Sequence, residues 1–153
     1  MAQWFECKIR FDKTMEDGKI KRVTEAYMVD ALTFTEAERR FLEEVEPFVS
    51  GDYEVADIKK AKLAEVMTSN DGNDDRWYKA KVTFITLDEK TAVEKRTAQN
   101  ILVQARDLKT AVANLEKGMA GTMGDWELTA VNETAILDIY PYKAPSDSPL
   151  KGE

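Results

Sequence analysis

The stretch Trp4-Phe5-Glu6-Cys7-Lys8-Ile9-Arg10-Phe11 returns, in pattern, as Trp77-Tyr78-Lys79-Ala80-Lys81-Val82-Thr83-Phe84. Each copy has a tryptophan followed by a second aromatic residue, a lysine four positions after the tryptophan, and a closing phenylalanine. The copies lie 73 residues apart, and further matches follow in the same order, such as Lys21-Arg22 with Lys95-Arg96. A collinear similarity over both halves predicts an internal duplication.

Alternation inside the repeated stretch predicts a half-buried strand in each copy. One face carries Phe5, Cys7, Ile9 and Phe11 in the first copy and Tyr78, Ala80, Val82 and Phe84 in the second. We expect this face to form the core, with Cys7 as a small buried residue and not a reactive thiol. The tryptophans and lysines fall on the other face.

Turn and capping signals place the remaining elements of the first copy. Asp17-Gly18 predicts a hairpin that leads into a strand over 20–31, and Thr33 with Glu36 forms a capping box for a helix over 34–46. Residues 53–67 have strand composition interrupted by Lys59–Lys62, which predicts one bent strand or two short strands joined by a bulge. The second copy repeats this order, with strands over 77–84 and 93–105, a helix capped by Asp107 and a strand pattern over 125–140.

These elements predict an α+β protein with two ββαβ or ββαββ units, each having one helix and a mainly antiparallel sheet. We expect residues 1–67 to form the first repeat, 68–76 a linker, 77–142 the second repeat and 143–153 a disordered tail. One unit alone buries only one face of its sheet. We therefore expect the repeats to form one compact domain, related by a pseudo-two-fold axis.

Composition excludes several classes of protein. The 153 residues are 43% hydrophobic and 33% charged, with no apolar run near the roughly 20 residues of a membrane span. The N-terminal residues lack the features of a signal peptide, and the chain has a single cysteine, so we expect a cytoplasmic protein. The net charge of −7 argues against coating nucleic acid by bulk electrostatics.

The chain contains no histidine, which removes the commonest general base, the usual catalytic triads and all histidine-containing metal sites. We therefore expect a protein that is not an enzyme and that binds no cofactor or metal. The cluster Asp71-Gly72-Asn73-Asp74-Asp75 resembles part of a calcium loop, but it lacks the downstream glutamate, so we interpret it as part of the linker.

The tryptophan and lysine face is the candidate binding surface. Aromatic rings among basic side chains on a sheet suit single-stranded DNA or RNA, because bases stack on the rings and cations follow the phosphates. The candidate nucleic-acid-binding residues are Trp4, Lys8, Arg10, Lys21, Arg22, Trp77, Lys79, Lys81, Lys95 and Arg96. In the alternative interpretation the tryptophans are buried and the lysines only solvated. The protein would then be a homo-oligomeric (homodimeric) structural protein or an adaptor that contacts another protein.

Four segments carry a resemblance to a known family: WFECKIRFDKT, KRVTEAYMVDALTFTEAE, WYKAKVTFITLDEKTAVEKRTAQNILVQARDLKTAV and the closing ILDIYPY. They resemble an uncharacterised domain family found in Bacteroidetes and in phages that infect them, over residues 4–142. The family has no established activity to assign to particular residues. The resemblance therefore implies a bacterial or phage origin and no site.

Overall fold

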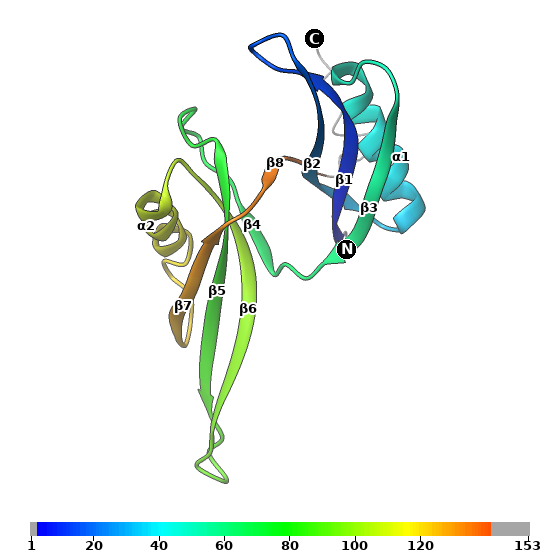
Figure 1. Cartoon of the computed structure of the whole chain (residues 1–153). Helices are drawn as coiled ribbons and strands as arrows, with labels where there is room; N and C mark the ends of the chain where they lie inside the picture. The colour runs from blue at the N-terminus through cyan, green and yellow to red at the C-terminus, as the bar shows by residue number, and fades with distance from the viewer. Residues whose placement is uncertain (1–2, 142–153) are drawn as a thin grey trace, which may run out of the picture. The chain divides into compact units, whose positions relative to one another are not determined.

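The computed structural model describes residues 3–141, which form two units with one four-stranded sheet and one helix each (Figure 1). One unit contains residues 3–61 and 136–141, and the other contains residues 62–135. The predicted α+β class, with one helix to each sheet, is confirmed. The tail predicted to be disordered, residues 143–153, lies outside the described residues. Neither long helix within residues 3–141 has the length and apolar character needed to cross a membrane.

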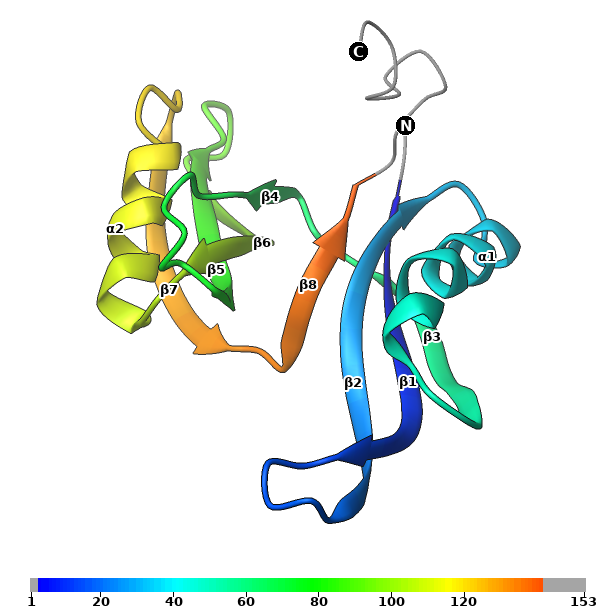
Figure 2. The same ribbon diagram turned by 90° about the horizontal axis from the view of Figure 1, so that it is seen from above.

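Two long antiparallel strands form the centre of the first sheet. β1 (Gln3–Thr14) and β2 (Ile20–Ala31) form the predicted hairpin, and Gly18 adopts a φ of 83° in its turn. Glycine reaches this conformation without a steric penalty. β3 (Tyr53–Ala61) pairs antiparallel with β1, and β8 (Ile136–Tyr140) pairs parallel with β2, as Figure 2 shows. The strand order is therefore β3-β1-β2-β8.

Helix α1 (Phe34–Val45) covers the predicted core face of this sheet. The core cluster on this face contains Phe5, Cys7, Ile9 and Phe11 from β1, Val29 and Ala31 from β2, and Ala37, Phe41 and Val45 from α1. The capping box also forms: Thr33 Oγ1 accepts a hydrogen bond from the Glu36 backbone N–H at 3.1 Å, and Glu36 Oε1 accepts one from the Leu32 N–H at 2.6 Å. A short 3₁₀ helix, η1 (Glu46–Phe48), follows α1.

The second unit repeats this plan. β5 (Arg76–Leu87) and β6 (Glu94–Ala105) form its central hairpin, and β7 (Asp125–Glu133) pairs antiparallel with β5. β4 (Glu65–Met67) pairs parallel with β6, so the order is β4-β6-β5-β7. Helix α2 (Leu108–Gly118) begins after Asp107, whose Oδ1 accepts a hydrogen bond from the Thr110 N–H at 2.8 Å. Its Leu115 packs on the buried side chains of β5 and β6.

The two sheets share an irregularity as well as a strand order. Pairing between β1 and β3 shifts register between Lys8 and Ile9, and pairing between β5 and β7 shifts between Lys81 and Val82. These positions are 73 residues apart, the offset of the sequence repeat. A bulge depends on local backbone geometry, so its recurrence at the equivalent place supports duplication. The pseudo-two-fold axis stays a prediction.

The fourth strand of each sheet comes from the other sequence repeat. β4 follows β3 in the chain but pairs with β6, whereas β8 follows β7 but pairs with β2. Met67 lies opposite Val103, and Tyr140, 73 residues after Met67, lies opposite Val29. The repeats therefore exchange their last strands reciprocally. As a result, the repeats over 1–67 and 77–142 do not coincide with the two spatial units.

This exchange changes the interpretation of two segments. Residues 53–67 form two strands, β3 and β4, that belong to different sheets. Residues 62–64 connect them, so the two strands are not joined by a bulge within one sheet. The predicted linker over 68–76 lies inside the second unit, where it connects β4 to β5 and contains the buried side chain of Asp74. The chain passes between the units at Ala61–Lys62 and Ala135–Ile136.

Candidate functional site

Four predicted nucleic-acid-binding residues of the first unit lie on the sheet face opposite α1. They are Trp4, Lys8 and Arg10 on β1 and Arg22 on β2. Side chains alternate between the faces of a strand, so these positions share parity with each other and not with Phe5 and Cys7. Trp4 and Lys8 are half-buried, and both arginines are exposed.

Carboxylates on neighbouring strands engage both arginines of this face. Arg10 Nη1 lies 2.8 Å from Glu54 Oε1, and Arg22 lies 3.6 Å from Glu54 and 3.4 Å from Asp12. The hydrogen bond from the Arg10 guanidinium holds the pKa of Glu54 below its ordinary value. These contacts are exposed and add little to stability. They do, however, offset the positive charge that a phosphate backbone would meet.

The second unit places Trp77, Lys79, Lys81 and Arg96 on the equivalent face. Trp77 is only 2% exposed, so its ring is closed to a stacking base, whereas Lys79 and Lys81 are exposed. Arg96 forms ion pairs with Glu127, on β7, and with Glu94. The pair with Glu127 is the counterpart of the Arg22–Glu54 pair in the first unit.

Lys21 and Lys95 lie on the other face of their sheets. Lys21 pairs with Lys13, and Lys95 pairs with Thr86, which places both lysines on the side that carries the helix. The sequence reasoning grouped them with the adjacent Arg22 and Arg96, but successive residues of a strand point in opposite directions. Lys8, Lys79 and Lys81 are the predicted cations on the tryptophan face that have no ion pair within residues 3–141.

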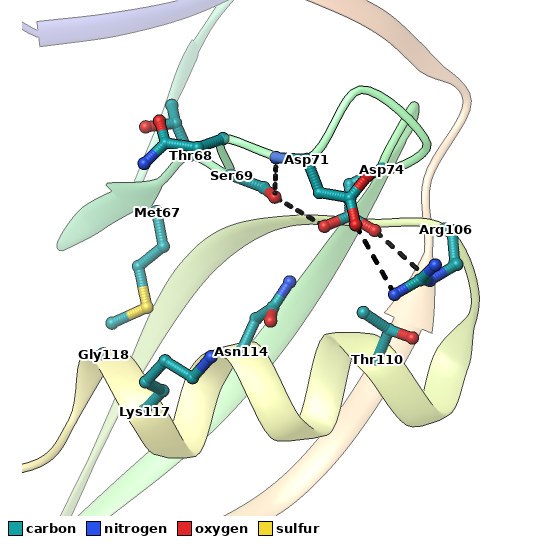
Figure 3. A pocket seen from close by; sticks show the side chains of 11 residues that line it. Met67, Thr68, Ser69, Asp71, Asp74, Arg106, Thr110, Asn114, Lys117 and Gly118 are labelled. Atoms are coloured by element: carbon teal, nitrogen blue, oxygen red, sulfur yellow. Dashed lines mark hydrogen bonds and ion pairs between the residues drawn. The ribbon is translucent and has the colours of Figure 1, made fainter.

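A second candidate site is a polar pocket of about 570 Å³ in the second unit, between the β4–β5 connection and α2 (Figure 3). Side chains from both segments point into it. Its lining residues are Met67, Thr68, Ser69, Asn70, Asp71, Asp74, Arg106, Thr110, Asn114, Lys117 and Gly118. All of them belong to the second unit.

Asp74 forms one end of the pocket and is 5% exposed. Its Oδ2 accepts a hydrogen bond from Ser69 Oγ at 2.5 Å, whereas its Oδ1 accepts no hydrogen bond from the described residues. Arg106 Nε lies 3.6 Å from that Oδ1, and Arg106 Nη2 lies 3.7 Å from Asp71 Oδ2. The guanidinium is thus shared between two carboxylates, at distances longer than a hydrogen bond.

The loop that holds Asp74 is ordered by its own polar groups. The Ser69 N–H donates to Gln104 Oε1 at 2.9 Å, the Asp71 N–H donates to Ser69 Oγ at 3.1 Å, and the Asn73 N–H donates to Asp71 Oδ1 at 2.9 Å. Asp71 therefore serves a turn of the kind that aspartate side chains favour. No group of three or more metal-ligating side chains occurs within residues 3–141.

The opposite end of the pocket lies along α2. Asn114 Nδ2 donates to the Gln104 carbonyl oxygen at 3.0 Å, and the Lys117 side chain is exposed and lies beside Met67 in Figure 3. Gly118 leaves space for Met67, since a Cβ at Gly118 would meet Met67 Sδ at 2.5 Å. The pocket thus has carboxylates at one end and an ammonium group at the other.

Sequence reasoning missed this pocket because it assigned residues 68–76 to a linker. One signal could have found it: Arg106, Thr110, Asn114 and Lys117 recur at helical spacing and give α2 a polar stripe. Such a stripe is also typical of a solvated helix face. The sequence alone does not show that this one faces a buried aspartate.

The fold and these sites define an α+β protein built from two repeats that exchange their last strands. Residues 3–142 match the family described as "Domain of unknown function (DUF4494)", and the chain belongs to this family. The match confirms the resemblance to an uncharacterised domain family and assigns no activity. A comparison with curated proteins finds no match.

Proposed function

We propose that this protein is a non-catalytic binding protein that associates with a second copy of itself through the tips of its two long hairpins. One observation carries the proposal. Ile20 is 71% exposed at the tip of the β1–β2 hairpin, and Val93 is 59% exposed at the tip of the β5–β6 hairpin. Ile20 is the first residue of β2, and Val93 directly precedes β6, so both copies expose a β-branched apolar residue at the start of the second hairpin strand, within one position of each other in the repeat.

Both hairpins extend beyond the rest of their sheets. β3 pairs with β1 only as far as Phe11, and β7 pairs with β5 only as far as Ile85. The remaining residues of each hairpin therefore form a two-stranded arm (Figures 1 and 2). Met15 and Leu87 add further exposed apolar surface to these arms. Apolar residues gathered at a projecting tip are typical of an association surface, because covering them removes that surface from water.

Sedimentation velocity of the full chain tests the proposal. We expect a dimer whose population rises with concentration, and Ile20→Ser combined with Val93→Ser should shift the chain to monomer. Met123→Ser is the matched control, because Met123 is 90% exposed but lies outside both hairpins. A wild-type chain that stays monomeric at about 1 mM, where the free energy of association would be weaker than about −4 kcal/mol, would contradict the proposal.

A second candidate function is binding of single-stranded DNA or RNA. It is favoured by Lys79 and Lys81, which are exposed and form no ion pair with the residues that the structure describes. Two ammonium groups two residues apart on one strand can contact successive phosphates. Titration of a fluorescently labelled oligonucleotide at low salt tests this candidate, with Lys79→Glu combined with Lys81→Glu as the variant. Glu substitutions at Lys109 and Lys117, on α2, provide a control with the same change in charge. Equal binding by the two double variants would contradict a role for the β5 lysines.

The resemblance and the single cysteine support two broader proposals. The first is an origin in Bacteroidetes or their phages, and the second is a cytoplasmic location. The buried thiol of Cys7 agrees with a protein that needs no disulfide.

A further inference from the structure

We propose that the pocket between the β4–β5 connection and α2 binds a small zwitterion of the amino-acid class, with the ammonium group of the ligand at Asp74 and its carboxylate at Lys117. The proposal is independent of self-association through the hairpins. The pocket volume of about 570 Å³ lies in the range of small-molecule sites.

The first unit shows that the fold itself does not require a hollow at this place. Tyr140, the counterpart of Met67, stacks on Tyr27 with ring centroids 5.7 Å apart. Arg40, the counterpart of Asn114 on the helix, donates from Nη2 to the Pro141 carbonyl oxygen at 2.9 Å. The first unit thus fills with its own side chains the position that the second unit leaves open.

Shorter side chains open the pocket in the second unit. The second unit has Met67 where the first unit has Tyr140, and these positions correspond through the strand register. It has Asn114 where the first unit has Arg40, at the same place in the helix. Apart from Met67 and Gly118, the residues that line the vacated space are polar, so the apolar side chains of the core do not fill it. A polar ligand can occupy it.

The buried carboxylate of Asp74 favours a positive charge at one end of that ligand. Its carboxylate is 95% removed from solvent, yet Oδ1 accepts no hydrogen bond from the described residues, and Arg106 is divided between Asp71 and Asp74. A desolvated carboxylate oxygen without a donor is unfavourable, and a charged donor is its strongest partner. Oδ1 has almost no accessible surface in the structure, so a protonated amine reaches it when a neighbouring side chain such as the exposed Arg106 moves aside, and it then supplies that donor and a balancing charge.

The ammonium group of Lys117 favours a negative charge at the other end of the ligand. Its ammonium group lines the pocket and forms no ion pair within residues 3–141. Lys117 and Asp74 lie at opposite ends of the pocket (Figure 3), so the Lys117 ammonium group can bind an anionic group of the same ligand. A carboxylate fits this end, and an amine together with a carboxylate is the pattern of an amino acid.

Backbone amide spectra of the ¹⁵N-labelled full chain test the proposal, with each standard L-amino acid added separately at about 1 mM, a concentration suited to weak small-ligand binding. We expect at least one amino acid to shift amides in residues 67–74 and 106–118. Its N-acetyl derivative and its decarboxylated amine should each bind at least about tenfold more weakly, because each lacks one charge. Absence of any shift in these segments with all amino acids would overturn the proposal. Equal binding of either derivative would overturn the assignment of the corresponding end.

Two variants locate the site. Asp74→Asn removes the charge at nearly constant volume, and Asn114→Arg places the side chain of the first unit into the pocket. We expect both to abolish the amide shifts. Glu43→Gln, at the counterpart of Lys117 in the first unit, is the control and should leave binding unchanged. If Asp74→Asn disturbs the fold, Asn114→Arg still decides the question, and retention of full binding by a folded Asn114→Arg chain would overturn the location.

Discussion

Cys7 lies on the helix-facing side of the first sheet, where solvent does not reach its side chain. Its side chain is fully buried, and burial, with a smaller contribution from the negative charge of Glu6, raises the pKa of the thiol from 9.0 to about 12. The thiolate is the reactive form of cysteine, so this residue is inert at neutral pH. The position corresponds to Ala80 in the second copy, which indicates that a small side chain without a polar group suits it.

We expect Cys7→Ala to lower the free energy of unfolding by about 1 kcal/mol, because it removes one buried heavy atom. Cys7→Ser should cost more, by about a further 1–3 kcal/mol, because a buried hydroxyl needs a partner. The thiol donates to the Phe5 carbonyl oxygen, which lies 4.0 Å from Sγ, and a serine oxygen on a shorter C–O bond is too far from it for a hydrogen bond. Urea unfolding of the two variants measures the difference. A serine variant as stable as the alanine variant would contradict this account.

Tyr27 on β2 and Tyr140 on β8 predict that the free energy of unfolding falls at alkaline pH. Burial is the main cause that raises the pKa of Tyr27, followed by the charge of Glu25, and burial with Asp138 raises the pKa of Tyr140 from 10.0 to about 12. The neutral phenol is therefore favoured in the folded state. Its stabilising effect is complete below pH 10 and is lost as pH rises through the folded-state pKa.

We expect the free energy of unfolding to fall between about pH 10 and 12 because the unfolded state releases these protons first. Tyr140→Phe should flatten that fall, since phenylalanine retains the ring and removes the titrating group. Tyr142→Phe is the matched control at a neighbouring position outside the described residues. Chemical denaturation at several pH values measures the effect. A fall of unchanged steepness in Tyr140→Phe would show that other groups cause it.

Residue patterns predicted the core better than the surface. Alternation assigned Phe5, Cys7 and Ile9 to the core because a buried face tolerates little besides apolar side chains. The same alternation places Lys21 and Lys95 on the face opposite their neighbouring arginines, so neither lysine belongs to the predicted binding surface. Trp77 was expected to carry function at the surface, and it is buried, whereas its counterpart Trp4 is half-buried. The difference depends on packing that neither stretch of sequence specifies.

At the level of elements, local signals determine where the helices begin. Thr33 and Asp107 each accept a hydrogen bond from the third residue that follows, at equivalent places in the two copies. The first turn of a helix leaves its N–H groups without internal partners, and these side chains supply them. This explains why both helix starts could be predicted from sequence.

We expect Thr33→Ala to lower the free energy of unfolding by about 1 kcal/mol, since it removes the hydrogen bond to the Glu36 N–H. Thr35→Ala is the control: this threonine is exposed within the first turn of the helix, where alanine is the better helix former. Urea unfolding followed by circular dichroism measures both variants. Equal stability of the two would mean that the cap contributes nothing.

The short strands and the pocket could not be predicted because they depend on distant partners. β4 has three residues, and its parallel pairing with β6 joins segments more than thirty positions apart. The pocket likewise lies where the β4–β5 connection meets α2, and two of its lining residues, Met67 and Asn114, are smaller than their counterparts in the first unit. Periodicity within one segment contains no information about such pairs.

For the whole molecule, the exchange of last strands makes the two units unequal. The second unit is continuous, because β4, β5, β6, α2 and β7 all lie within residues 62–135. The first unit is discontinuous, since its sheet is completed only by β8 at residues 136–140. During synthesis from the N-terminus, the chain therefore contains every strand of the second unit before it contains the last strand of the first.

This inequality predicts that a chain ending at Ala135 loses the first unit and keeps the second. The truncation removes the buried Ile136 and Ile139 and the stacking of Tyr140 on Tyr27. Truncating a single buried isoleucine to alanine costs about 2–5 kcal/mol, and a domain has only about 5–15 kcal/mol in total. Hydrogen exchange should therefore show faster exchange in β1, β2 and α1, with β5, β6 and α2 still protected.

A chain ending at Pro141 is the control, because it retains every strand of both sheets. Equal loss of protection in both units of the Ala135 chain would mean that the second unit depends on the first. Full protection of β1 and β2 in that chain would mean that β8 contributes no stability. Loss confined to the first unit would establish that a strand from the second repeat holds the first unit together, whereas the second unit is stable without the first.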